Sequence, residues 1–194
     1  AAAPSPATAP AGGLPQQPTS HLQGHSQCVS SITWADEGSL FSGGWDHSVR
    51  RWDAATGINT DTYNGSKVVC CVATPPPSQG SNGLVAFGCS DKVLRVWDSR
   101  AKSSSNEGLA VKHLPAHAGW LVSVAWCPNS AHHVATASHD HTIKLWDLRC
   151  LVPLATLASH TDKALCVTWL GGSSQLASGG ADCKLRTYTL DQPL

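Results

Sequence analysis

The chain has 194 residues, of which 41% are hydrophobic and 13% are charged, and its formal net charge at pH 7 is zero. This length is sufficient to bury a core, whereas a zero net charge argues against binding nucleic acid by phosphate neutralisation, so direct RNA contact is not expected. No stretch is apolar enough, over a sufficient length, to span a bilayer, so no membrane association is expected either.

The first 20 residues consist of Ala, Pro, Gly, Gln, Ser and Thr, apart from Leu14. Such a segment buries too little apolar surface to offset its ordering entropy, so residues 1–20 are predicted to be a disordered Ala/Pro-rich linker. The segment has neither the basic start nor the apolar core of a secretory signal. The chain contains no Met, which suggests a fragment of a longer protein or a partial gene model.

After the linker, the chain repeats itself four times. In each repeat an Asp is followed six residues later by an aromatic residue, and by residue number these aromatics lie 45, 49 and 42 residues apart. This period is typical of the four-stranded blades of a β-propeller, with longer turns over residues 75–83 and 99–108. Residues 21–194 are therefore predicted to form propeller blades, with repeats at about 24–63, 64–112, 113–157 and 158–190.

Three short runs in each repeat are predicted to be strands, because they are rich in β-branched and aromatic residues and are bounded by Gly, Asn and Asp. Outer strands are expected after three of the repeats, for example over residues 153–157. The second runs cover residues 40–43, 85–88, 134–137 and 176–179, and the third runs cover 49–52, 94–97, 143–146 and 185–188. The first runs carry their apolar residues at Val29, Ile32 and Trp34; Val68, Cys71 and Ala73; Leu121, Val124 and Trp126; and Ala164, Val167 and Trp169.

These patterns resemble the WD-repeat family. Gly24-His25 matches the Gly-His that opens a repeat of the family, and Trp52-Asp53 matches the Trp-Asp that closes one. The resemblance implies a buried, hydrogen-bonded tetrad of His, Ser or Thr, Asp and Trp in each complete blade. The tetrad maps to His25, Ser42, Asp46 and Trp52; to His117, Thr136, Asp140 and Trp146; and, with Tyr in place of Trp, to His160, Ser178, Asp182 and Tyr188.

The second repeat departs from this pattern. It keeps Asp91 and Trp97 but has Asn64-Gly65 where Gly-His is expected, and Phe87 where the hydroxyl is expected. A complete tetrad is therefore not expected in the second blade.

A narrower resemblance covers residues 42–49, 117–126, 158–163 and 178–185, which are similar to the last four blades of the WD-repeat ribosome biogenesis proteins of the PeBoW complex. It implies an all-β, partial propeller: four blades of a seven-bladed ring, forming an open arc. The alternative is a closed four-bladed ring in which residues 20–23 pair with the last blade. The ubiquitin-like domain and the first three blades of that family are absent from this sequence.

The same resemblance implies a non-catalytic scaffold without cofactors that acts in maturation of the large ribosomal subunit and in pre-rRNA processing. The implied partners are a block-of-proliferation-type WD-repeat protein and pescadillo, on pre-60S particles in the nucleolus and nucleoplasm. The residues themselves offer no nucleophile elbow, phosphate loop or metal-ligand spacing. None of the eight cysteines forms a C-x-x-C pair, and adjacent Cys70 and Cys71 point to opposite faces of a strand, so neither a metal site nor a disulfide is expected.

Three residues are candidates for partner binding. Trp45 and His139 each directly precede a turn Asp, and Trp120 directly precedes a first strand. The equivalents of Trp120 in the other repeats are taken to be Cys28, Lys67 and Lys163, mostly polar, which favours an exposed Trp; exposed Trp is enriched at interface hot spots. An alternative for Trp120 is that it folds back onto its own blade.

Three further motifs admit other interpretations. The W-D-x-R sequences that end at Arg100 and Arg149 resemble a motif of WD-repeat substrate receptors of cullin–RING ubiquitin ligases, an alternative function. Contiguous Ser138-His139-Asp140 is not a catalytic triad, because triad members come from separate chain segments. A recurring basic position could suggest an RNA-binding stripe, but it is common in WD repeats generally; it comprises Arg50, Arg95, Lys144 and Arg186.

Overall fold

The computed structural model describes residues 20–79, 83–101, 110–150, 152–170 and 174–190, so the predicted linker lies, except for Ser20, outside the described residues. Within these ranges the chain is all-β, with one short 3₁₀ helix, η1 (Pro77–Gln79). None of the described helical residues could reach across a bilayer. The all-β prediction is confirmed.

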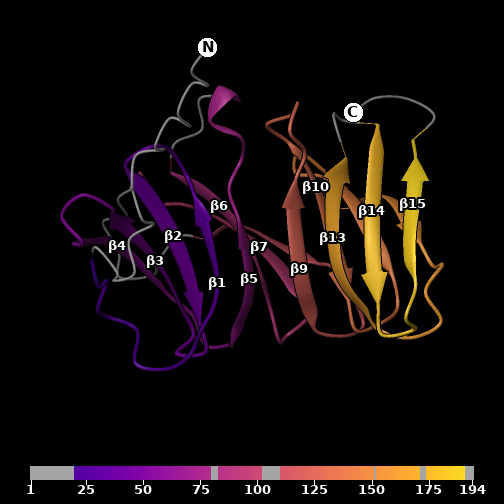
Figure 1. Cartoon of the computed structure of the whole chain (residues 1–194), viewed down its shortest axis with the longest axis horizontal. Helices are drawn as coiled ribbons and strands as arrows, with labels where there is room; N and C mark the ends of the chain where they lie inside the picture. The colour runs from indigo at the N-terminus through magenta and orange to yellow at the C-terminus, as the bar shows by residue number, and fades with distance from the viewer. Residues whose placement is uncertain (1–19, 80–82, 102–109, 151, 171–173, 191–194) are drawn as a thin grey trace, which may run out of the picture.

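Four antiparallel sheets stand side by side in chain order, from the sheet that contains β1 to β4 at the left of Figure 1 to the sheet that contains β15 at the right. In each sheet the strands pair in sequence order, as successive hairpins. The first sheet has β1 (Val29–Trp34), β2 (Ser39–Gly44), β3 (Ser48–Asp53) and β4 (Asn59–Asn64); the second has β5 (Val69–Ala73), β6 (Leu84–Cys89), β7 (Val93–Asp98) and β8 (Ala110–Pro115); the third has β9 (Leu121–Trp126), β10 (His133–Ser138), β11 (Ile143–Asp147) and β12 (Pro153–Leu157); the fourth has β13 (Ala164–Leu170), β14 (Gln175–Gly180) and β15 (Leu185–Thr189).

Each first strand carries a bulge near its start, which sets the register of the blade. Ile32 pairs with Ser42 and Val124 with Thr136, and the matching pair in the second blade is Val72 with Phe87. The first-strand pattern predicted for the second blade, Val68, Cys71 and Ala73, was therefore wrong by one residue. The equivalents are Val69, Val72 and Thr74, and a one-residue slip exchanges the two faces of a strand.

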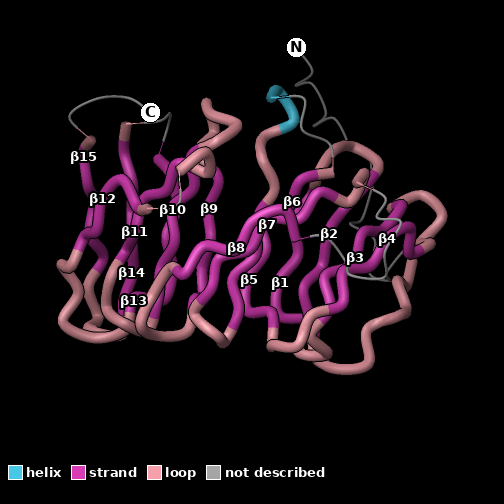
Figure 2. Tube along the Cα trace, turned by 180° about the vertical axis from the view of Figure 1, so that it is seen from behind, coloured by secondary structure: helices cyan, strands magenta, loops and turns pink. Residues whose placement is uncertain are grey.

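The sheets pack face to face with their first strands adjacent, so β1 lies beside β5, β5 beside β9 and β9 beside β13. The outer strands β8 and β12 lie on the opposite side of the arc, seen in Figure 2. Phe41 and Val49 of the first sheet meet Phe87 and Trp97 of the second in one buried cluster. Similar clusters fill the other two junctions, so the middle sheets are buried on both faces.

The two ends of the arc are open. Ile32 and Trp34 on β1 are 69% and 59% exposed, and Leu185 on β15 is 77% exposed. The described strands of the fourth sheet do not pack on those of the first, and residues 20–23 form no strand. The open arc is confirmed, and the alternative of a closed four-bladed ring is wrong. Exposed apolar faces and a free edge at β15 are expected to favour self-association of the chain on its own.

Candidate functional site

The first blade is held together by a chain of four side chains. The Trp52 indole N–H donates to Ser42 Oγ at 2.7 Å, and that oxygen lies 2.7 Å from His25 Nε2. His25 Nδ1 in turn contacts both carboxylate oxygens of Asp46, at 3.0 and 2.9 Å. Because an indole can only donate, the Ser42 proton is free for Nε2, and the Nδ1 proton then goes to Asp46. The predicted residues of this blade therefore lie within one continuous network.

The third blade repeats the same chain of contacts. Trp146 Nε1 donates to Thr136 Oγ1 at 2.9 Å, Thr136 lies 2.8 Å from His117 Nε2, and His117 Nδ1 lies 2.9 Å from Asp140 Oδ2. In the fourth blade the corresponding distances are 3.0 Å for His160–Asp182, 2.7 Å for His160–Ser178 and 3.2 Å for Ser178–Tyr188. The phenol of Tyr188 thus reaches the hydroxyl that an indole reaches elsewhere.

The buried carboxylates are kept ionised by their hydrogen bonds. Burial raises the pKa of Asp140, but hydrogen bonds from Thr142 and the Ala118 amide, together with His117, outweigh it and leave the pKa at about 2. Asp46 has a pKa of about 2 by the same balance, with burial opposed by Ser48, Ser26 and His25. Burial lowers the pKa of His117, which is therefore neutral at pH 7. The tetrads are structural supports, and each pins the start of its blade to the turn between its second and third strands.

The networks contain two further hydroxyl groups that the sequence pattern did not predict. Ser48 donates to Asp46 at 2.8 Å, and Thr142 donates to Asp140 at 2.7 Å. Their signal was present, because in both blades the turn Asp is followed two residues later by Ser or Thr. A short hydroxyl side chain at that spacing commonly bonds to the Asp of a turn.

The second blade replaces the tetrad by an ion pair. Arg95 contacts Asp91 through two hydrogen bonds, at 2.9 and 2.6 Å. Trp97 packs against Phe41 and Tyr63, with ring centroids 5.9 and 6.0 Å apart. The expected absence of a complete tetrad here agrees with this geometry, and the pairing of Arg95 was not foreseen.

The tetrads lie at one end of the sheets, which we call the tetrad face: the turns at residues 45–47, 90–92, 139–141 and 181–183 and the residues directly before each first strand. The turn between β14 and β15 marks this end at the lower edge of Figure 1, where β9 and β13 begin. The third residue of each turn has positive φ, between 58° and 73°, so the four turns share one backbone form. The backbone contacts Trp45–Cys28, Ser90–Val68, His139–Trp120 and Ala181–Lys163 repeat on this face.

The three candidate partner-binding residues all lie on the tetrad face. Trp45 is 50% exposed and Trp120 is 49% exposed. The Trp120 ring stacks on His139, with centroids 6.2 Å apart and an interplanar angle of 8°, so Trp120 contacts its own blade and still presents half of its surface. The backbone contacts above also show that Val68, not Lys67, is the equivalent of Trp120 in the second blade.

The two W-D-x-R arginines lie at the opposite end of the sheets, directly after β7 and β11. Arg100 is held by Asp98 through Nε and Nη2, both at 2.9 Å, and Arg149 is held by Asp147 at 2.7–3.0 Å. Each guanidinium folds back onto the Asp of its own motif, although the side chains remain 50% and 63% exposed. These two Arg–Asp contacts close the turn that follows the third strand. This structural role explains the geometry without a binding partner.

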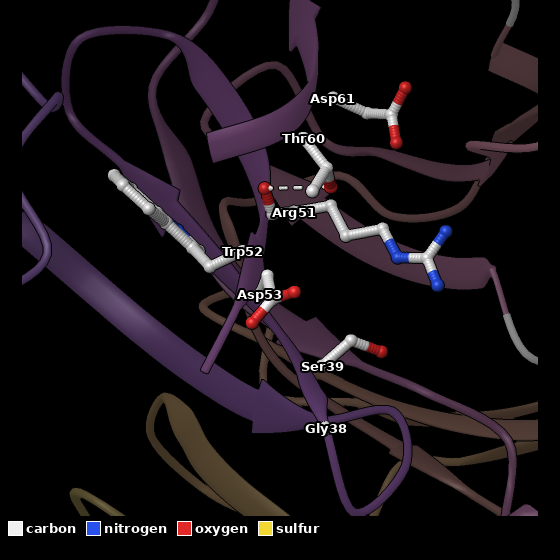
Figure 3. Close-up of a pocket in the computed structure, with 7 residues that line it drawn as sticks. All are labelled: Gly38, Ser39, Arg51, Trp52, Asp53, Thr60 and Asp61. Atoms are coloured by element: carbon white, nitrogen blue, oxygen red, sulfur yellow. Dashed lines mark hydrogen bonds between the residues drawn. The ribbon is translucent and has the colours of Figure 1, made fainter. Parts of the chain in front are cut away.

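A hollow at that same end of the first blade is lined by residues of β2, β3 and β4, and its volume is about 210 Å³. Figure 3 shows Arg51 and Trp52 pointing in opposite directions, as successive strand residues do. The Arg51 guanidinium lies 6.0 Å from the Phe41 ring and donates to Ser99 at 3.4 Å, so it already has partners. No reactive set of side chains meets there.

The described residues hold no group of three His, Cys, Asp or Glu side chains that could bind a metal. All eight cysteines are free thiols, and Cys71 is buried whereas its neighbour Cys70 is partly exposed. Burial raises the pKa of the Cys70 thiol and raises that of Cys89 to about 12, so neither is a ready nucleophile.

Radial antiparallel sheets of three or four strands, three of them braced internally by a His–Ser/Thr–Asp network that ends at Trp or Tyr, define a segment of a WD-type β-propeller. The family model described as "WD domain, G-beta repeat" matches four segments that cover most of the chain, at residues 16–53, 57–98, 108–147 and 151–189. The chain therefore belongs to the WD40-repeat family.

Several of its relatives carry the name "Ribosome biogenesis protein WDR12 homolog". The chain is 57% identical to that of Chlamydomonas reinhardtii over 175 residues, 43% identical to that of Nematostella vectensis over 173 and 41% identical to that of Oryza sativa subsp. japonica over 167. These alignments cover 86–88% of this chain but only 37–39% of each relative. The chain thus spans well under half the length of these relatives.

Proposed function

We propose that this chain is a non-catalytic interaction scaffold in maturation of the large ribosomal subunit and pre-rRNA processing, and that its tetrad face binds the partner. The partners proposed are a block-of-proliferation-type WD-repeat protein and pescadillo, within a PeBoW-like complex on pre-60S particles of the nucleolus and nucleoplasm. The relatives named for ribosome biogenesis support the process. The proposed partners rest on the narrower sequence resemblance.

One observation carries the choice of surface. Trp45 and the stacked Trp120–His139 pair leave about half of two indole rings in solvent on a single face. Trp45 lies in a turn beside the tetrad Asp46, and Trp120 stacks on the turn residue His139, so little conformational entropy is lost when a partner covers the two rings. Exposed, rigidly held Trp side chains are typical of binding hot spots.

The test is co-purification of the block-of-proliferation partner with the full chain. Replacing both Trp45 and Trp120 by Ala is expected to lower the affinity by about tenfold or more, because truncating hot-spot residues commonly costs at least ~2 kcal/mol. Arg149→Ala is the matched surface control at the other end of the blades. Undiminished binding by the double variant would remove the tetrad face from the proposal. Loss of a ubiquitin-ligase adaptor on Arg149→Ala would favour the cullin–RING alternative instead.

A further inference from the structure

The tetrad face has a small pocket on the second blade that no role above explains. Its volume is about 110 Å³. It is lined by Tyr63, Gly65, Ser66, Lys67, Val69, Cys89, Arg95 and His113.

The pocket lies where the other blades keep their tetrad His. Counting back from the paired first-strand residues Val29 and Val69, Gly65 takes the position of His25. A Cβ on Gly44 would lie 2.7 Å from His25 Nδ1, and one on Gly180 would lie 2.4 Å from His160 Nδ1. The second blade has Cys89 at this position, so its side chain stands beside the place that the imidazole takes in the first and fourth blades. With Gly65 in place of the His, a hollow remains that Cys89 lines on one side.

The side chains around the hollow include the basic residues Lys67 and Arg95. Lys67 and His113 are exposed at its mouth, and Arg95 lines it from β7. Asp91 pairs with Arg95 and offsets that charge, but no carboxylate is among the lining residues. Burial raises the pKa of Tyr63, whose hydroxyl is therefore neutral and able to donate a hydrogen bond. The lining is rich in donors and holds no acidic acceptor.

We propose that this pocket binds the side-chain carboxylate of an Asp or Glu on a protein partner, which Lys67 and Arg95 contact directly. Charge-assisted hydrogen bonds from ammonium and guanidinium groups match a carboxylate. The volume suits the end of one side chain, whereas a nucleic-acid phosphodiester would have to bring two sugars with it. The proposal deepens the proposed function, since it needs a protein partner on the tetrad face, and it places an acidic anchor beside the apolar Trp45 and Trp120.

The experiment is an NMR titration of the full, ¹⁵N-labelled chain with acetyl-Gly-Asp-Gly-amide, followed at the amides of Gly65 and Lys67. The Asp peptide is expected to give saturable shifts at these amides, and its Asn counterpart none. Lys67→Glu is expected to weaken binding by about tenfold, the size of losing one charge-assisted hydrogen bond, and Lys67→Gln by less. Lys92→Glu is the matched control, because Lys92 is an exposed residue of the same blade and face that does not line the pocket.

Three results would overturn the proposal: no saturable shift with the Asp peptide, equal weakening by Lys92→Glu, or tighter binding of dimethyl phosphate than of the Asp peptide. The last would point to a nucleic-acid backbone. The titration needs no partner, so it can fail while Trp45 and Trp120 still govern co-purification. Conversely, the pocket can bind the Asp peptide even if the co-purification test fails.

Discussion

Trp146→Ala is expected to lower the free energy of unfolding by about 3–5 kcal/mol, the usual range for truncating a buried Trp. Trp146 is 1% exposed and belongs to the cluster between the second and third sheets, so its loss opens a cavity at a blade junction. The change also removes the indole N–H that donates to Thr136. Urea unfolding followed by circular dichroism measures the effect as a lower midpoint.

Trp45→Ala is the natural control, because it deletes the same side chain from a half-exposed position. A surface substitution of this kind is expected to stay within about 0.5 kcal/mol of the parent. Equal midpoints for Trp146→Ala and the parent chain would contradict the packing of the sheets described above. A stable Trp45→Ala chain would also show that any lost partner binding reflects the surface and not the fold.

The repeat pattern predicted most of the strands correctly. The error in the first strand of the second blade has a local cause. The Asp-to-aromatic spacing predicted the place of every second and third strand, because the Asp belongs to the turn between these strands and the aromatic residue is part of the third strand. The first strand of the second blade was misplaced by one residue. In the other blades the His anchors the count, whereas Asn64-Gly65 offers no such anchor. The bulge that opens each first strand makes a count by alternation alone unreliable.

The candidate site was less accessible from the sequence than the fold. The positions of Trp45 and Trp120 at the ends of strands followed from the repeat, but the stacking of Trp120 on His139 depends on side-chain directions that spacing does not specify. The pocket beside Gly65 was missed for a similar reason. The sequence shows that the second blade lacks the tetrad His. Only the packed side chains show that a pocket lined by Gly65 and Cys89 remains there.

Asp140→Ala is expected to lower the free energy of unfolding by about 1–3 kcal/mol, because His117 and the Ala118 amide would be left without their acceptor. Asp46→Ala should behave alike in the first blade. Glu37→Ala is the control, since Glu37 is an exposed acidic residue. Unchanged urea midpoints in both Asp variants would show that the tetrads do not stabilise the blades.

Acid should reveal the same networks in the parent chain. The folded pKa of Asp140 is about 2, below its ordinary value of 3.8, so its stabilising contribution is full above pH 4 and is lost as the pH falls toward 2. The lowered pKa of His117 acts in the same direction at higher pH, because below about 6.5 the unfolded chain takes up a proton that the folded chain refuses. Urea midpoints should therefore fall in two stages on acidification. Asp140→Asn should make the lower stage smaller, since an amide has no proton to gain there, while Asp46 keeps its own share. An identical profile in that variant would assign the acid sensitivity to other carboxylates.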